Sequence, residues 1–183
     1  MNRLLLFLII PWLLGGCAVT APYAIMDDKR LLDTMSNDKA IATSIKTALV
    51  EKSISSGMSL AVYCYYRNVY IVGEIPEYMK ETVVEIAQRE HPRSITTHFF
   101  THQKSAESDF LLATRLRAKL IEKPGLSSTR VDTEVNAGRV VLLGVVGSES
   151  EKRLAIQTAK RVDGVRSVVS YLMLPPKPGE HDK

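Results

Sequence analysis

Residues whose side chains could perform catalysis or bind a metal ion are scarce in this sequence. It contains two cysteines and four histidines among 183 residues, and no G-x-S-x-G, H-E-x-x-H or C-x-x-C motif is present. His98 and His102 are the closest pair of histidines, but a predicted change from strand to linker lies between them and no third ligand follows at a known spacing. Solvated histidines explain this pair better than a metal site. We therefore predict no catalytic residue, no metal and no cofactor.

The remaining nucleophiles have structural explanations. Cys64 lies in a segment of alternating apolar residues, without a neighbouring cation or helix start that would activate its thiol, so it is predicted to be a core residue. Ser148 opens an S-x-x-E pattern that ends at Glu151, which is typical of a helix N-cap. Residues 144–147 lack the spacing of a phosphate-binding P-loop. The sequence accordingly favours a binding or scaffold protein over an enzyme.

The first seventeen residues have the composition of an export signal. The single cation Arg3 precedes an apolar run from Leu4 to Leu14. This run of eleven residues is about half of the roughly 20 that are needed to cross a bilayer as a helix, and Pro11 interrupts it. A cleaved signal peptide therefore fits residues 1–17 better than a permanent transmembrane anchor.

The segment ends in Leu14-Gly15-Gly16-Cys17, which resembles the lipobox of bacterial lipoproteins. The resemblance implies that diacylglycerol is attached to the thiol of Cys17, that the chain is cleaved before this residue and that the new amine is acylated. Several acyl chains anchor a protein stably, whereas a single chain binds only marginally. By resemblance to lipoprotein sorting signals, Ala18 in place of Asp implies a lipid anchor in the outer membrane, facing the periplasm. An ordinary signal peptide with a chance cysteine is the alternative.

Segments without a packed core are predicted at both ends of the folded part. Residues 18–36 contain Pro22 and an acidic pair, and are interpreted as a tether. The stretch Pro175-Pro176-Lys177-Pro178-Gly179 ends regular structure, so residues 175–183 are predicted to be a disordered tail. Because Cys17 is expected to carry lipid, Cys64 has no partner within the chain and no disulfide is predicted.

The folded part contains an internal repeat with an offset of 71 residues. Residues 38–75 align with residues 109–146 without a gap, and apolar positions stay apolar in both copies. The identical pairs are Asp38/Asp109, Ala42/Ala113, Thr43/Thr114, Leu49/Leu120, Glu51/Glu122, Lys52/Lys123, Ser56/Ser127, Val69/Val140 and Gly73/Gly144. Chance could supply a few identities but would not also preserve the apolar register. The sequence therefore indicates a tandem duplication.

The apolar period predicts the same order of elements in each copy. Helical spacing predicts an opening helix whose N-cap is Asn37 in copy one and Ser108 in copy two. The later elements of copy two are predicted as strands at residues 131–135 and 140–146, a helix at residues 148–162 and a strand at residues 165–174. Each copy is thus predicted as helix, strand, strand, helix, strand. This is an α+β fold in which a three-stranded sheet packs on two helices.

Copy two carries motifs of a known domain family. Residues 138–146 read G-R-V-V-L-L-G-V-V, and residues 162–168 read V-D-G-V-R-S-V. These stretches resemble the G-x-V-x-L-x-G-x-V strand and the later V-x-G-V-x-x-V turn of the BON domain. Copy one keeps the strand around Val69 but lacks the leading and the late glycine, so it is similar to a degenerate BON domain. We therefore predict two tandem BON-like domains, at residues 37–104 and 105–174.

A lipobox followed by two such domains resembles the dual-BON lipoproteins of the outer membrane. The resemblance implies a non-catalytic periplasmic protein that binds anionic phospholipid and supports envelope integrity. The alternative is an adaptor or scaffold that binds another envelope protein or peptidoglycan. Residues 37–104 hold eight Lys or Arg and seven Asp or Glu, whereas residues 108–174 hold eleven and seven, so the basic excess lies in the copy with the intact motif. The net charge of +4 for the whole chain is too low to indicate nucleic-acid binding.

The phospholipid site is predicted on the opening helix of copy two. If the apolar positions of this helix face the sheet, Leu111, Arg115 and Lys119 lie along one flank, with Phe110 and Thr114 on the neighbouring one. Phe110 and Leu111 would then enter the acyl boundary of a membrane while Arg115 and Lys119 meet lipid phosphates. The resemblance implies the same helix. The alternative is an ordinary solvated flank of a core helix.

Three tyrosines of copy one, Tyr63, Tyr65 and Tyr70, point away from the predicted core side of their sheet. An adaptor would use this face to bind a partner. We favour packing of the two copies against each other, because a three-stranded sheet needs cover on its second face. The complementary surface in copy two is predicted to consist of Val141, Leu143 and Val145.

Overall fold

The computed structural model describes residues 32–105 and 107–176, which form two copies of one α+β unit. The predicted signal peptide, the lipobox with Cys17, most of the tether and residues 177–183 of the tail lie outside the described residues. The first copy comprises α2 (Leu32–Lys52), α3 (Ile54–Ser59), β1 (Leu60–Tyr65), β2 (Asn68–Gly73), η2 (Glu77–Met79), α4 (Lys80–Gln88) and β3 (Ser94–Phe99). The second comprises α5 (Asp109–Ile121), η3 (Ser128–Arg130), β4 (Val131–Asn136), β5 (Arg139–Val145), α6 (Glu149–Lys160) and β6 (Ser167–Met173).

Each copy contains a three-stranded sheet with the same topology. In the first sheet β2 is central and pairs antiparallel with β1 and parallel with β3. In the second sheet β5 is central and pairs in the same way with β4 and β6. A parallel neighbour requires a crossover connection, which α4 and α6 supply. The predicted fold class, α+β with two tandem BON-like domains, is confirmed.

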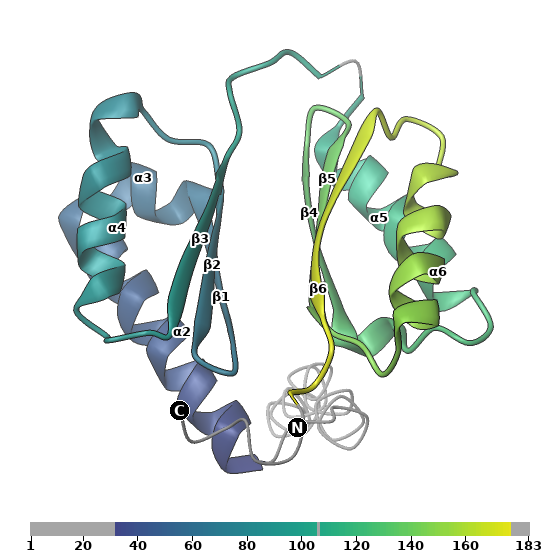
Figure 1. Ribbon diagram of the computed structural model, residues 1–183. Coiled ribbons are helices and arrows are strands. Elements are labelled where there is room, and N and C mark those ends of the chain that lie inside the picture. Colours follow the sequence, from purple (N-terminus) through teal and green to yellow (C-terminus); the bar gives the residue numbers. More distant parts are fainter. Residues whose placement is uncertain (1–31, 106, 177–183) are drawn as a thin grey trace, which may run out of the picture.

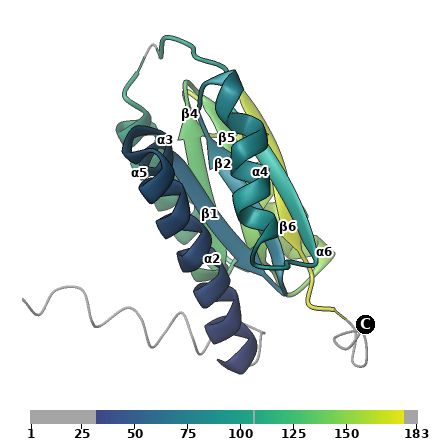
Figure 2. The same cartoon turned by 90° about the vertical axis from the view of Figure 1, so that its left-hand side faces the viewer.

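The helices cover the outer face of each sheet, and the two sheets face each other (Figure 1). Figure 2 shows α2 and α4 lying side by side across the outer face of the first sheet. The molecule therefore has four layers in the order helices, sheet, sheet, helices.

Each copy has its own hydrophobic core between the sheet and its helices. The core of the first copy includes Ile45, Leu49, Val69 and Ile71, each at most 1% exposed. The core of the second includes Leu116, Leu120, Val131 and Leu142, all 0% exposed. Burial of one such side chain contributes roughly 1.5–3 kcal/mol to stability, so these residues stabilise the packing of the helices on the sheet in each copy.

An aspartate at the same position of each copy fixes the hairpin turn. Asp38 is 1% exposed and accepts hydrogen bonds of 2.8 Å from the backbone N–H groups of Tyr66 and Arg67. Its counterpart Asp109 accepts a 2.7 Å bond from the N–H of Ala137. Tyr66, Arg67 and Ala137 have φ angles of 53°, 62° and 48°, in the left-handed region that two-residue hairpin turns require. The shared aspartate of the repeat is therefore explained by the turn that it stabilises.

The opening helix of the first copy starts earlier than predicted. α2 begins at Leu32, so Asn37 is not its N-cap, and residues 32–36 belong to the helix instead of the tether. No Gly or Pro separates Leu32 from Asn37, and Asp33 in the first turn interacts favourably with the helix dipole. The helix therefore continues toward the N-terminus past the predicted cap.

The predicted caps of the second copy are only partly formed. Ser108 is the N-cap of α5, although its side chain makes no capping hydrogen bond. At the start of α6, the Ser148 hydroxyl accepts a bond of 3.1 Å from the N–H of Glu151. The Glu151 carboxylate accepts from the N–H of Gly147 at 2.6 Å and pairs with Arg130 at 2.9 Å. The reciprocal half of the capping box is absent among the described contacts, because Glu151 is engaged by these other donors.

The facing sheets share a third hydrophobic cluster, which joins the two copies. It contains Tyr65, Tyr66, Val72 and Phe100 of the first copy and Val141, Leu143 and Val145 of the second, each at most 6% exposed. Tyr63 and Tyr70 are partly buried and pack against this cluster. The prediction that the tyrosine face packs on Val141, Leu143 and Val145 is confirmed.

Candidate phospholipid-binding site

The start of α5 exposes two large apolar side chains. Phe110 is 76% exposed and Leu111 55%, whereas Leu112 and Leu116 face the core at 2% and 0%. Apolar side chains that lie next to each other on a surface are typical of sites that contact a membrane or another protein. The structure thus leaves both predicted apolar side chains exposed at the start of α5.

Arg115, predicted as a phosphate ligand, already has protein partners. Its guanidinium donates to both carboxylate oxygens of Glu107 and, at 2.6 Å, to the carbonyl oxygen of Asp163. The hydrogen bonds from Arg115 lower the pKa of the Glu107 carboxyl. Arg115 therefore ties α5 to the segment before it and to the loop after α6. A lipid phosphate would have to share this guanidinium with Glu107 and Asp163.

Thr114 and Lys119 are held less firmly. The Thr114 hydroxyl donates to the carbonyl oxygen of Phe110, one turn earlier in the same helix, at 2.8 Å. The Lys119 ammonium lies 2.9 Å from a carboxylate oxygen of Glu122, and the two side chains are 56% and 63% exposed. Exposed pairs of this kind contribute about 0–1 kcal/mol, so Lys119 can exchange Glu122 for a phosphate at little cost.

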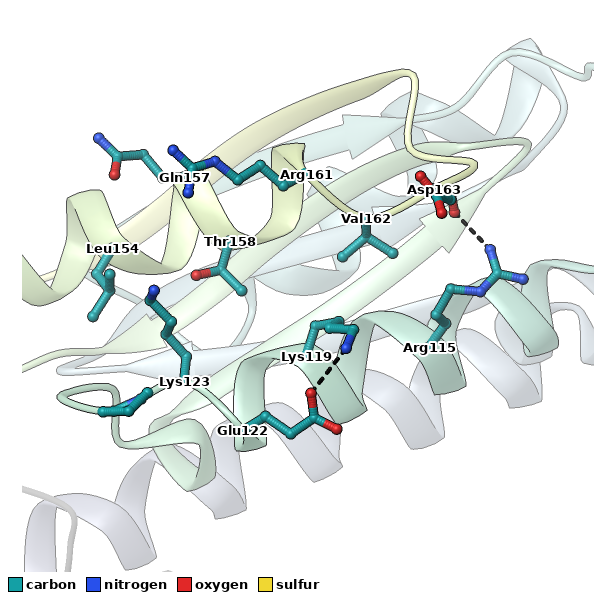
Figure 3. A pocket seen from close by; sticks show the side chains of 11 residues that line it. Arg115, Lys119, Glu122, Lys123, Leu154, Gln157, Thr158, Arg161, Val162 and Asp163 are labelled. Carbon is teal, nitrogen blue, oxygen red and sulfur yellow. Dashed lines mark hydrogen bonds and ion pairs between the residues drawn. The ribbon is translucent and has the colours of Figure 1, made fainter.

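A groove of about 380 Å³ separates α5 from α6 (Figure 3). It is lined by four cations and two carboxylates, namely Arg115, Lys119, Lys123, Arg161, Glu122 and Asp163. Leu154 and Val162 add apolar surface. The groove brings together Arg115 and Lys119 from the predicted site but not Phe110, Leu111 or Thr114, which lie outside its lining.

Two cations of the groove were not among the predicted residues. Lys123 continues the spacing of four that runs from Leu111 through Arg115 and Lys119, so the sequence contained a signal for it. Arg161 follows the end of α6, on the other side of the groove. No local pattern links Arg161 to α5, and only the packing of the two helices brings it to the site.

The residues considered for catalysis or metal binding lie elsewhere. Cys64 is 6% exposed, and its thiol lies 3.3 Å from the carboxylate of Asp38, as expected for a core residue. His98 Nδ1 lies 3.1 Å from the Tyr171 hydroxyl between the two copies. Burial lowers the pKa of His98, and the nearby charge of Arg139 lowers it further. Across residues 32–105 and 107–176, no group of three or more His, Cys, Asp or Glu side chains could hold a metal ion.

None of the helices in the described part of the chain has both the length and the apolar character that crossing a bilayer requires.

Comparison with known proteins identifies the second copy. Residues 108–174 match the family model of the BON domain. The chain is 27% identical over 144 residues to osmotically-inducible protein Y of Escherichia coli (strain K12), a match that covers 74% of this chain and 72% of that protein. It is also 30% identical over 71 residues to an uncharacterized protein in the gshII 5′ region of Anaplasma centrale, covering 39% of this chain and 47% of that protein. This chain thus spans about half the length of that second relative.

Among solved structures, the chain is similar to the C-terminal domain of CdsD, the structural protein of the Type III secretion system of Chlamydia trachomatis. That match has a TM-score of 0.33 and 13% sequence identity, and it covers 76% of this chain and 67% of that one. The family assignment rests on the sequence match of the second copy. Residues 108–174 of this protein are a BON domain.

Proposed function

We propose that this protein is a non-catalytic lipoprotein of the cell envelope that binds anionic phospholipid through α5 of its BON domain. The observation that carries the proposal is the exposed apolar pair Phe110 and Leu111, which precedes the basic residues Arg115 and Lys119 on the same helix. An apolar insertion flanked by cations is the arrangement by which interfacial helices bind anionic membranes.

The expected strength of this contact is modest. Full burial of one large apolar side chain contributes roughly 1.5–3 kcal/mol, and each cation near an anionic surface contributes about 1 kcal/mol. Two residues of each kind give weak, reversible binding once the entropy of association is deducted. A lipid anchor at Cys17 would hold the BON domain beside the membrane and raise its effective concentration there. We therefore propose that anchor and α5 act together on the periplasmic side of the outer membrane and support its integrity.

The adaptor alternative is not supported by the arrangement of the two copies. The face that an adaptor would present carries Tyr63, Tyr65 and Tyr70, and in the structure this face packs on the second sheet. It is therefore not available to a partner in the folded protein.

Vesicle co-sedimentation of the full chain tests the proposal. Vesicles rich in phosphatidylglycerol should retain the protein more strongly than phosphatidylcholine vesicles, and binding should weaken as salt rises because charge screening increases. Replacing Phe110 and Leu111 with Ser should lower binding to anionic vesicles by about tenfold or more, since two apolar insertions are lost.

A matched control is available on α3. Ile54 and Met58 are 73% and 68% exposed, so replacing both with Ser removes a similar exposed apolar pair from another part of the surface. This control variant should bind as the unmodified protein does. Equal binding by all three proteins, or equal loss in both variants, would rule out α5 as the membrane contact.

A further inference from the structure

We propose that the groove between α5 and α6 binds the phosphodiester headgroup of an anionic phospholipid, with Lys123 and Arg161 as phosphate ligands. The inference rests on the proposed function and adds a headgroup site to the apolar contact made by Phe110 and Leu111.

The partners of the four cations in the groove distinguish them. Arg115 is bonded to Glu107 and Asp163, and Lys119 to Glu122. The side chains of Lys123 and Arg161 make no hydrogen bond or ion pair with any other described residue. Both residues line the groove, Lys123 from beyond the end of α5 and Arg161 from the end of α6. In Figure 3, Lys123 points toward α6 and Arg161 lies along α6 beside Gln157. These two cations are therefore the ones that a phosphate can engage without displacing a protein carboxylate.

The lining of the groove can contact both a phosphate and an organic group attached to it. Leu154 and Val162 provide apolar contacts, while Gln157 and Thr158 of α6 offer polar groups beside Arg161. Binding sites for small molecules typically combine apolar walls with a few polar groups that orient the ligand. A phosphodiester that carries a glycerol group has both an anionic centre and hydroxyls, and so matches this mixed lining.

The position of the groove along α5 is compatible with membrane contact by the same helix. Leu111 and Lys123 are twelve residues apart, which corresponds to about 18 Å along a helix axis. An interfacial helix sinks only roughly 5–10 Å into the membrane, so a helix that entered end-on at Leu111 would keep Lys123 away from the lipid headgroups. With α5 lying along the surface, the apolar pair and the groove would thus engage neighbouring lipids.

The first copy lacks two of the four cations that line the groove. Ser44 and Ala48 occupy the repeat positions of Arg115 and Lys119. The Ser44 hydroxyl donates to the Glu90 carboxylate at 2.5 Å, which places an acidic group between α2 and the end of α4. The first copy therefore lacks the counterparts of Arg115 and Lys119, and a carboxylate is bonded at the first of these positions.

The repeat nevertheless supplies matched controls for the two proposed ligands. Lys52 is the repeat partner of Lys123. Arg89 is the C-cap residue of α4, as Arg161 is of α6. Replacing Lys52 and Arg89 with Ser removes the same two charges as replacing Lys123 and Arg161, at the equivalent places of the other copy.

The experiment compares both double variants of the full chain with the unmodified protein. The quantity measured is the difference in binding between phosphatidylglycerol-rich and phosphatidylcholine vesicles, which cancels any contribution of the N-terminal residues. K123S/R161S should lower this difference by about tenfold or more, and K52S/R89S by less than about threefold. Amide chemical shifts of residues around Lys123, Thr158 and Arg161 should move when glycerol 1-phosphate is added, and more than with inorganic phosphate. Thermal unfolding should be unchanged in both variants because the replaced side chains pack in no core.

The outcomes separate the groove from the proposed function. If the unmodified protein prefers anionic vesicles and both double variants lose binding equally, attraction is diffuse and the headgroup site is refuted, while the proposed function stands. If the protein shows no preference for anionic vesicles but glycerol 1-phosphate shifts the groove residues, the site serves a soluble phosphate and the membrane assignment is wrong. If neither occurs, both proposals fail.

Discussion

The hydroxyl of Tyr63 lies 2.5 Å from a carboxylate oxygen of Glu134, and these two residues are repeat partners, 71 positions apart. A contact between equivalent positions of two copies is expected where an approximate twofold axis passes between them. The two sheets therefore pack about an internal pseudo-symmetry, with this hydrogen bond near its centre. Two identical copies would bring identical side chains together at this site. Here a tyrosine of one copy donates a hydrogen bond to a glutamate of the other.

The same pair predicts a pH dependence of stability. Burial raises the pKa of Glu134, and the hydrogen bond from Tyr63 opposes this. Because the pKa in the folded state lies above that of the unfolded chain, the stability contribution of Glu134 is fully present at low pH and is lost as pH rises through the folded-state pKa. The free energy of unfolding of the Glu134→Gln variant, relative to that of the unmodified protein, should therefore increase from pH 4 to pH 7. Urea unfolding at the two pH values measures this.

Glu122 provides the control for that experiment. Its side chain is 63% exposed and pairs only with Lys119 among the contacts described here. The Glu122→Gln variant loses the same charge without touching the interface between the sheets. A change at Glu122 as large as that at Glu134 would show that overall charge, and not the buried position, causes the effect.

Gly144 is predicted to be intolerant of any side chain. It has φ of 129°, and a Cβ there would lie 2.0 Å from the carbonyl oxygen of Arg130. Replacement by Ala should cost about 3 kcal/mol or more, because backbone must shift in the central strand β5. Replacement of Gly125, with φ of 81° and its nearest contact at 3.8 Å, should cost only about 1–2 kcal/mol from the left-handed conformation. Thermal or urea unfolding distinguishes the two, and similar losses would contradict the steric explanation.

The BON domain expressed alone should fold but associate. Residues 105–176 retain the core around Leu116 and Leu142, so dispersed amide resonances are expected. Val141 and Leu143, both 0% exposed in the full chain, lose the cover of the first copy. Sedimentation should therefore show concentration-dependent self-association, which replacing both residues with Thr should abolish. A strictly monomeric fragment at high concentration would indicate that the face between the sheets contributes little.

Replacing Cys17 with Ser tests the proposed lipid anchor. Without the thiol no thioether to diacylglycerol can form, so the protein should not incorporate labelled fatty acid. It should also leave the membrane fraction almost completely, because the proposed contact of α5 is expected to be weak without the anchor. Replacing Cys64, which is buried, leaves the anchor intact and serves as the control. Normal acyl labelling of the Cys17→Ser protein would disprove the assignment.

Much of the architecture could be read from local patterns. The tandem repeat, the α+β class and the packing of the tyrosine face on Val141, Leu143 and Val145 were all predicted, because alternation within a strand decides which side chains share a face. The start of α2 at Leu32 was not, since Asn37 has the type of an N-cap residue and nothing local forbids the helix from extending past it. Helix boundaries depend on small energies that cap preferences alone do not decide.

The candidate site divides in the same way. Sequence by itself determined that Leu111, Arg115 and Lys119 follow one another at a spacing of four, with Phe110 beside Leu111, because the period of a helix is a property of the backbone. Only the tertiary structure decided that Arg115 is bonded to the carbonyl of Asp163, 48 residues away, and that Arg161 and Lys123 line the same groove. Such contacts depend on how α6 packs beside α5 on the sheet. That packing depends on the summed burial of many apolar side chains. No local pattern in either helix predicts which charged groups the packing brings together.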